Sequence, residues 1–128
     1  MRLLLDTSSF LWFVAGSDRL SGKARELMED FDNELVLSVA SLWEMAIKAS
    51  IGKLELLRPF DQFIPEKLEE NEIDILHISL PHLSEMMALP FHHRDPFDRL
   101  IIAQSIFENL PVIACDSIFK NYSADIIW

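Results

Sequence analysis

Residues 2–9 read RLLLDTSS, a short apolar run that stops at a carboxylate and continues into residues that favour turns and helix starts. This pattern predicts a buried strand over residues 2–5, with a helix through residues 10–15 behind it. The same pattern returns in LVLSV at residues 35–39 and in PVIAC at residues 111–115. Both runs predict further buried strands, and the second also stops at an aspartate.

Helical and strand patterns alternate along all 128 residues, without a repeat or a low-complexity segment. Helical spacing predicts helices over residues 23–31, from Ser41 to Gly52, over 80–89 and from 95 to 110, with a helical turn at 117–122. Residues 59–72 predict a helix that is interrupted or restarted at Pro65, and residues 73–78 and 125–128 predict two further strands. This alternation predicts one domain, residues 1–128, of the α/β class: a three-layer α/β/α sandwich around a mostly parallel sheet.

Residues 92–104 read HHRDPFDRLIIAQ and predict a helix whose first turn is rich in charge. Asp95 suits the capping position, and Pro96 suits the first helical position. Asp98 falls in the first turn, where the helix dipole favours a negative charge. Two carboxylates at one helix start are either exposed to water, which screens their charge, or bind cations. This stretch is therefore also a candidate cation site.

The composition restricts the classes of partner. The net charge of −10 disfavours general nucleic-acid binding, which depends on Lys and Arg meeting phosphates. The acids therefore either surround a divalent metal or form a face for a basic partner. A single cysteine, Cys115, excludes an internal disulfide, and no apolar run is long enough to span a membrane. Because the first residues also lack a signal-peptide pattern, we expect a cytoplasmic protein without a membrane partner.

Four acids share one predicted position in the sheet. Asp6 and Asp116 follow predicted strands, whereas Glu44 and Asp98 lie in the predicted first turns of helices. Because the carboxyl ends of parallel strands share one edge, the four carboxylates can meet there. Oxygen ligands favour Mg²⁺ or Mn²⁺, which promote attack of water on a phosphodiester. A structural interpretation of Glu44 stays open, since Ser41 and Glu44 have the spacing of a capping box.

Several motifs together resemble the PIN-domain ribonucleases of the VapC toxin type, and the resemblance covers essentially the whole chain. The matching segments are LLDT at 4–7 with FLW at 10–12, LSVASLWEMAIK at 37–48, GKL at 52–54, HRDPFDRL at 93–100, and CD at 115–116 with Phe119. The resemblance implies a five-stranded parallel sheet and a Mg²⁺- or Mn²⁺-dependent endoribonuclease. It also implies an RNA substrate, with tRNA as one candidate, a cognate antitoxin as inhibitor, and a homodimer.

The resemblance also implies roles for individual acids. The catalytic and metal-binding residues would be Asp6, Glu44, Asp98 and Asp116, with Asp95 as an accessory acid on the rim. Two positions depart from the family pattern, which often has histidine where Ser8 stands and threonine or serine where Ala114 stands. The second change removes a hydroxyl near Asp116.

The basic residues nearest the predicted site are the candidates for contacts with RNA phosphates. These residues are Lys48, Lys53, Arg94 and Arg99. His92 and His93 predict loop or substrate contacts in place of metal ligation, because neighbouring side chains diverge and no histidine partner stands at ligand spacing.

Two other interpretations stay open at this point. A receiver-like phosphoacceptor domain would share an acidic cluster at strand ends, although Asp6 lacks the neighbouring acid that such domains carry. A catalytically degenerate PIN fold that only binds protein would explain the acidic surface and the changes at Ser8 and Ala114. The presence of all four main acids favours the nuclease.

Overall fold

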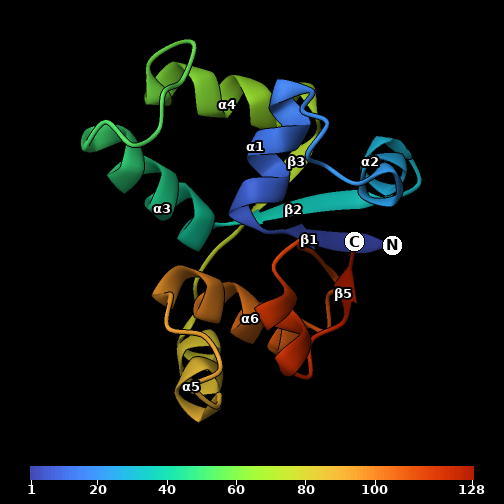
Figure 1. Cartoon of the computed structure of the whole chain (residues 1–128), viewed down its shortest axis with the longest axis vertical. Coiled ribbons are helices and arrows are strands. Elements are labelled where there is room, and N and C mark those ends of the chain that lie inside the picture. Colours follow the sequence, from blue (N-terminus) through green and yellow to red (C-terminus); the bar gives the residue numbers. More distant parts are fainter.

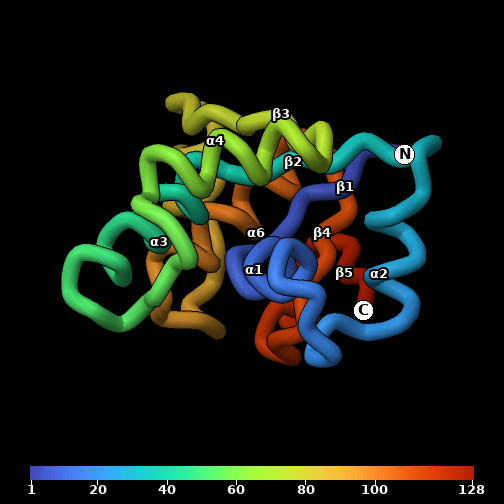
Figure 2. Tube along the Cα trace, turned by 90° about the horizontal axis from the view of Figure 1, so that it is seen from above, coloured from blue at the N-terminus to red at the C-terminus, as the bar shows by residue number.

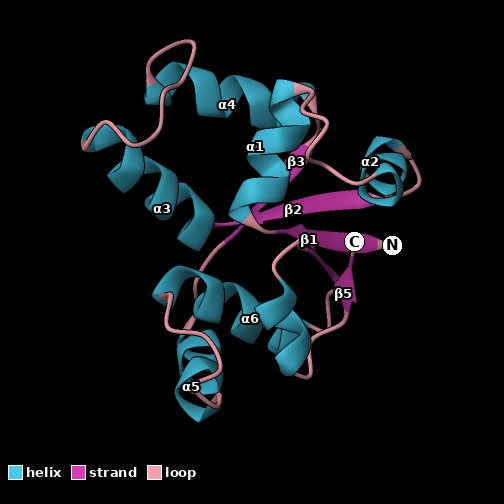
Figure 3. Cartoon of the chain, viewed as in Figure 1, coloured by secondary structure: helices cyan, strands magenta, loops and turns pink.

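The computed structural model describes all of residues 1–128 and shows helices on both faces of one sheet (Figure 1, Figure 3). In chain order the elements are β1 (Arg2–Leu5), α1 (Thr7–Ala15), α2 (Gly22–Glu29), β2 (Glu34–Ser38), α3 (Val39–Ser50), α4 (Phe60–Glu70), β3 (Ile73–Leu76), α5 (Leu80–Ala88), α6 (Pro96–Glu108), β4 (Val112–Ile113), the 3₁₀ helix η1 (Ser117–Asn121) and β5 (Ile126–Ile127). The predicted α/β sandwich is therefore confirmed.

The five strands are all parallel and lie in the order β3-β2-β1-β4-β5. The central strand β1 pairs on one side with β2, where Leu4 faces Val36, and on the other with β4, where Leu4 faces Val112. The chain thus builds outward from β1 in one direction and then returns to build in the other. In open α/β sheets, ligands bind beyond the carboxyl ends of strands at such a reversal.

The alternation of side chains along β1 explains why both faces of the sheet need a layer of helices. Leu3 and Leu5 are fully buried in one core cluster, with Phe10 of α1, whereas Leu4 is fully buried in the other, with Ile101 of α6. The helices α1, α2 and α4 cover the first face, and α5 and α6 cover the second (Figure 1, Figure 2). A strand buried on both faces needs a continuous apolar run, which the sequence contains.

Two helices begin earlier than predicted because a polar residue at the end of the preceding strand, or directly after it, caps them. Asp6 Oδ1 accepts a hydrogen bond from the Ser9 amide at 2.8 Å, so α1 begins at Thr7. Ser38 Oγ accepts from the Ala40 amide at 3.0 Å, so α3 begins at Val39. The prediction that Glu44 lies in the first turn is therefore wrong: it lies in the second turn of α3, and no capping box with Ser41 forms.

The predicted interruption at Pro65 is also wrong, because α4 is continuous from Phe60 to Glu70. Proline here removes only the hydrogen bond to the Asp61 carbonyl. The buried side chains of Phe63 and Ile64 anchor this part of the helix in the core, which compensates for that loss. No helix of the chain has the length and apolar character needed to cross a membrane.

Candidate acidic metal site

The acids predicted from the sequence approach one another at the carboxyl edge of the sheet. Asp6 follows β1, Asp116 follows β4, and Glu44 and Asp98 lie on α3 and α6. Their charges act on one another: Glu44 and Asp116 raise the pKa of Asp6, and Asp95 and Glu44 raise the pKa of Asp98. The structure therefore brings all five predicted acids into one cluster, and their catalytic and metal-binding roles stay predictions.

Asp6 is one of the two buried acids of the cluster, with its residue only 6% exposed. Burial raises its pKa from 3.8 to about 6, against the hydrogen bonds from Ser9, which lower it. Ser9 is itself held by its hydroxyl, which donates to the Ile113 carbonyl at 3.0 Å. The carboxylate therefore has a defined position between β1 and β4, close to the point where the strand order reverses.

Glu44 is equally buried, at 6% exposed, and two polar side chains, Thr7 and Lys48, hold it in place. The Thr7 hydroxyl donates to its Oε1 at 2.7 Å and lies 2.9 Å from Ser41 Oγ. Lys48, one turn further along α3, donates to Oε2 at 2.7 Å, and this hydrogen bond raises the pKa of the lysine. Sequence reasoning missed Thr7, whose only signal was its place directly after Asp6.

Asp98 and Asp116 meet at His93. His93 Nε2 lies 2.8 Å from Asp98 Oδ2 and 3.6 Å from Asp116 Oδ2. Burial raises the pKa of Asp98 to about 7, with a further increase from Asp95 and a decrease from the His93 hydrogen bond. One possible ligand atom from each of His93, Asp98 and Asp116 lies within 4.8 Å of the others.

The position of His93 was not predicted, since the sequence indicated only a loop or substrate contact. Its ring nitrogen Nδ1 accepts from the Asp95 amide at 3.4 Å, which assigns the ring proton to Nε2 and makes Asp98 the acceptor. The backbone amide of His93 donates to the Tyr122 hydroxyl at 2.8 Å. Hydrogen bonds therefore hold both the backbone and the ring of His93, and the ring belongs to the acidic cluster.

Asp95 is the predicted cap of α6. Its Oδ1 accepts from the amides of Phe97 at 2.8 Å and Asp98 at 3.2 Å. Pro96 occupies the first position of the helix. The cap fixes the direction in which α6 leaves the loop and hence the position of Asp98, while the charge of Asp95 raises the pKa of Asp98.

The four predicted RNA-contacting residues fall into different environments. Arg99 is only 6% exposed, and its guanidinium donates to the carbonyls of Pro90 at 2.9 Å and Met86 at 3.1 Å. It also stacks over the Phe91 ring at 4.2 Å. These contacts make Arg99 a structural clamp that ties α6 to the end of α5 and to the loop after it, so we remove it from the proposed RNA-binding residues. Lys48, Lys53 and Arg94 are exposed.

The donor chemistry of the cluster fits a hard divalent cation. Carboxylate oxygens are the ligands that Mg²⁺ and Mn²⁺ prefer. Asp6 is buried and Asp98 is half-buried, and the pKa values of both are raised toward neutrality, so their negative charge is incompletely compensated by the protein alone. A bound cation would supply that compensation.

The fold and the acidic edge define a PIN-type α/β domain, and comparison with known proteins agrees. Residues 3–125 match the PIN domain family, so the chain belongs to that family. The chain is similar to ribonuclease VapC16 of Mycobacterium tuberculosis, with 29% identity over 66 residues that make up 52% of this chain. The matched segment spans 47% of that relative, less than half of its length.

Solved structures of similar fold cover nearly the whole chain. VapBC2 from Rickettsia felis, bound to a promoter DNA fragment, gives a TM-score of 0.72 at 15% identity, over 99% of this chain and 98% of that one. FitAcB from Neisseria gonorrhoeae gives 0.61 at 19% identity, over 98% and 96%. VapBC-5 from M. tuberculosis gives 0.61 at 19%, over 98% and 95%. The resemblance to VapC-type PIN proteins is confirmed.

The receiver-like alternative is wrong. Receiver-type domains order their strands 2-1-3-4-5, with the first strand second in the sheet. In this protein β1 lies at the centre, in the order β3-β2-β1-β4-β5.

Proposed function

We propose that the protein is a divalent-metal-dependent endoribonuclease that hydrolyses RNA phosphodiester bonds with Mg²⁺ or Mn²⁺. The observation that carries this proposal is the pair of acids with raised pKa values, the buried Asp6 and the half-buried Asp98, at the carboxyl edge of a PIN-family sheet. The metal-holding residues would be Asp6, Glu44, Asp98 and Asp116. The bound cation would supply Lewis-acid stabilisation of charge on the phosphate and activation of water.

The surrounding residues orient this set of acids. Thr7 holds one oxygen of Glu44, and Lys48 holds the other. Asp95 fixes the start of α6 and so the place of Asp98, and it is the candidate accessory acid for accepting a proton at the rim. Such fixed carboxylates cost little reorganisation when charge develops in the transition state.

RNA would approach through the exposed basic residues Lys48, Lys53 and Arg94. The rest of the molecule opposes the approach, because the net charge is −10. Binding should therefore be weak and should fall steeply with salt. The RNA substrate class, with tRNA as one candidate, remains part of the proposal.

The deciding experiment incubates the purified protein with total cellular RNA in Mg²⁺, in Mn²⁺ and in EDTA. The Asp6→Asn/Asp98→Asn variant, purified in the same way, measures any contaminating nuclease. We expect cleavage by the parent in either metal, none in EDTA and none by the variant. Equal cleavage by parent and variant, or cleavage that persists in EDTA, would refute the metal mechanism. A parent that neither cleaves nor binds RNA would favour the degenerate interpretation, in which the fold only binds protein.

We also propose that the protein is the toxin of a toxin–antitoxin pair and acts in the cytoplasm. The similar solved structure VapBC-5 belongs to a family of toxin–antitoxin systems. An arginine from an inhibitor could pair with the acids of the site in place of the metal, through charge-assisted hydrogen bonds. Undiminished affinity of the neighbouring-gene product for the Asp6→Asn/Asp98→Asn variant would show that the inhibitor does not enter the acidic site.

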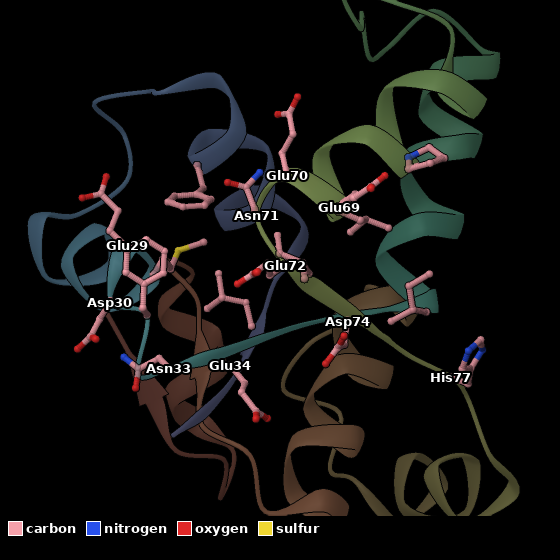
Figure 4. Close-up of a pocket in the computed structure, with 18 residues that line it drawn as sticks. Glu29, Asp30, Asn33, Glu34, Glu69, Glu70, Asn71, Glu72, Asp74 and His77 are labelled. Carbon is pink, nitrogen blue, oxygen red and sulfur yellow. The ribbon is translucent and has the colours of Figure 1, made fainter.

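A second acidic surface supports a basic partner. A groove of about 1320 Å³ lies between the ends of α2 and α4 and beside β3, and none of its lining residues is Lys or Arg (Figure 4). Its acids are Glu29, Asp30, Glu34, Glu69, Glu70, Glu72 and Asp74. Phe31 and Ile75, which are exposed, add apolar surface. This groove would steer a basic segment at long range and repel RNA.

We further propose that the protein forms a homodimer. Leu80 and Met87 of α5 are 78% and 80% exposed, and Phe107 of α6 is 50% exposed. Apolar side chains exposed on neighbouring helices are typical of an interface between protein chains. Sedimentation of the purified protein tests this, and a monomer across the concentration range would contradict it.

A further inference from the structure

An aromatic pair stands beside the acidic site and has no part in the chemistry described so far. Trp43 directly precedes Glu44 on α3, and Phe97 directly precedes Asp98 on α6. Their ring centroids are 5.0 Å apart, and the rings meet edge to face at 84°. The pair therefore connects α3 and α6, two helices that carry acids of the cluster (Figure 1).

The indole of Trp43 is poorly covered for a tryptophan, since the residue is 57% exposed. In an edge-to-face pair, Phe97 covers at most one face of the indole. More than half of the Trp43 surface is therefore open to solvent. The backbone of Phe97 is also fixed, because its amide donates to the capping Asp95 at 2.8 Å.

The protein has few free positive charges near the acidic site, so RNA affinity would need a contribution that does not depend on charge. The net charge is −10, Lys48 is already paired with Glu44 at 2.7 Å, and Arg99 is buried. Phosphate contacts alone therefore have few cations to use near the site. Stacking of a base on an aromatic ring adds affinity without a cation, and it tolerates any base because every base has a π face.

We propose that Trp43, supported by Phe97, stacks on an unpaired base of the RNA beside the phosphate held at the acidic site. This inference rests on the proposed ribonuclease function and assigns a further residue, Trp43, to its contact with RNA. A base that stacks on a protein ring must leave its own helix, so the substrate would be single-stranded RNA or an exposed loop. Continuous duplex RNA would bind poorly.

The experiment measures RNA binding apart from catalysis. A short single-stranded oligoribonucleotide is titrated in EDTA into the Asp6→Asn/Asp98→Asn protein, which cannot cleave and repels phosphate less than the parent. Trp43→Leu is added to this background, with Trp43→Phe as the conservative variant. The matched control is Phe31→Leu, since Phe31 is 96% exposed and lines the groove beside α2 and α4.

We expect Trp43→Leu to weaken binding about tenfold, with Trp43→Phe and Phe31→Leu much closer to the background protein. The ratio of the affinities of the background protein and of Trp43→Leu should stay the same as the salt concentration rises, because stacking releases no counterions. With an oligonucleotide that carries one abasic position, the effect of Trp43→Leu should disappear when the missing base is the stacked one. Quenching of tryptophan fluorescence by RNA should also be lost in Trp43→Leu.

Several results would overturn the inference. These are undiminished affinity in Trp43→Leu, equal affinity for duplex RNA, or no RNA binding by the background protein. Unchanged RNA binding together with altered sedimentation would assign Trp43 to an interface between copies of the chain. The two proposals fail separately. If RNA binding depends on Trp43 but the parent shows no Mg²⁺-dependent cleavage, only the ribonuclease proposal is refuted. If the parent cleaves RNA but binding does not depend on Trp43, only the stacking proposal is refuted.

Discussion

Thr7 donates a hydrogen bond of 2.7 Å to Glu44, a residue 37 positions further along the chain. This contact joins the first turn of α1 to the second turn of α3 and places Glu44 beside Asp6. A buried carboxylate needs such a donor, because an unpaired charge in the interior is strongly destabilising. Thr7 on α1 is thus a positioning residue for Glu44, which lies on α3.

Replacing Thr7 by valine tests this role, since valine keeps the shape and removes the hydroxyl. We expect a loss of about 1 to 3 kcal/mol in the free energy of unfolding, measured by urea denaturation in EDTA, because Glu44 loses a buried donor. Ribonuclease activity should fall at least about tenfold. Thr7→Ser restores the hydroxyl and should recover both quantities, and a valine variant with the parent's stability and activity would contradict the proposed role.

Glu44→Gln should nearly abolish cleavage and change the free energy of unfolding by about 1 kcal/mol or less. Glutamine still offers Oε1 to Thr7, but it lacks the charge that would hold a divalent cation. The structure removes the capping-box explanation, since Ser38 caps α3. Lys48→Met is the control for loss of the ion pair. Cleavage at the parent's rate by Glu44→Gln would place this residue outside the metal site.

The metal-free protein should lose stability as the pH rises through about 6 and 7, the raised pKa values of Asp6 and Asp98. Each carboxyl binds its proton more tightly when folded, so its contribution is complete below its ordinary pKa of 3.8 and disappears above the raised pKa. Asp6→Asn should remove its part of this dependence. At about pH 8 it should be more stable than the parent by up to about 3 kcal/mol, because one pKa unit corresponds to about 1.4 kcal/mol.

Thermal denaturation in EDTA across this pH range measures the effect. The exposed Asp18→Asn serves as the control for a simple change of net charge. Added Mg²⁺ should stabilise the parent at the higher pH and leave the Asp6→Asn/Asp98→Asn variant unchanged. A parent whose stability rises with pH in EDTA would show that the acids are not strained in the folded state.

Arg99 and Arg94 should behave oppositely on substitution. Arg99→Gln should lower the free energy of unfolding by about 2 to 4 kcal/mol, because the carbonyls of Pro90 and Met86 lose their buried donor. Arg94→Gln should leave stability within about 0.5 kcal/mol of the parent, weaken RNA binding and reduce the salt slope by about 1. A stable Arg99→Gln variant that has lost only RNA affinity would restore Arg99 to the RNA surface.

The sequence by itself determined the parts of the fold that local patterns record. Leu3, Leu4 and Leu5 form an apolar run that only a strand covered on both faces can bury, and it stops at Asp6. Asp95 and Pro96 start α6 through contacts within a few residues. Because parallel strands share their carboxyl edge, these local features were enough to predict an α/β sandwich with acids on one edge.

Only the tertiary structure decided which side chains complete the site. The Thr7–Glu44 hydrogen bond, the place of His93 between Asp98 and Asp116, and the burial of Arg99 all depend on how distant elements pack. The sequence around Arg99 does not indicate whether the arginine faces water or the carbonyl groups of a loop. Partners are set by the direction of each side chain after α1, α3 and α6 have packed on the sheet, and periodicity along one segment carries no record of that direction.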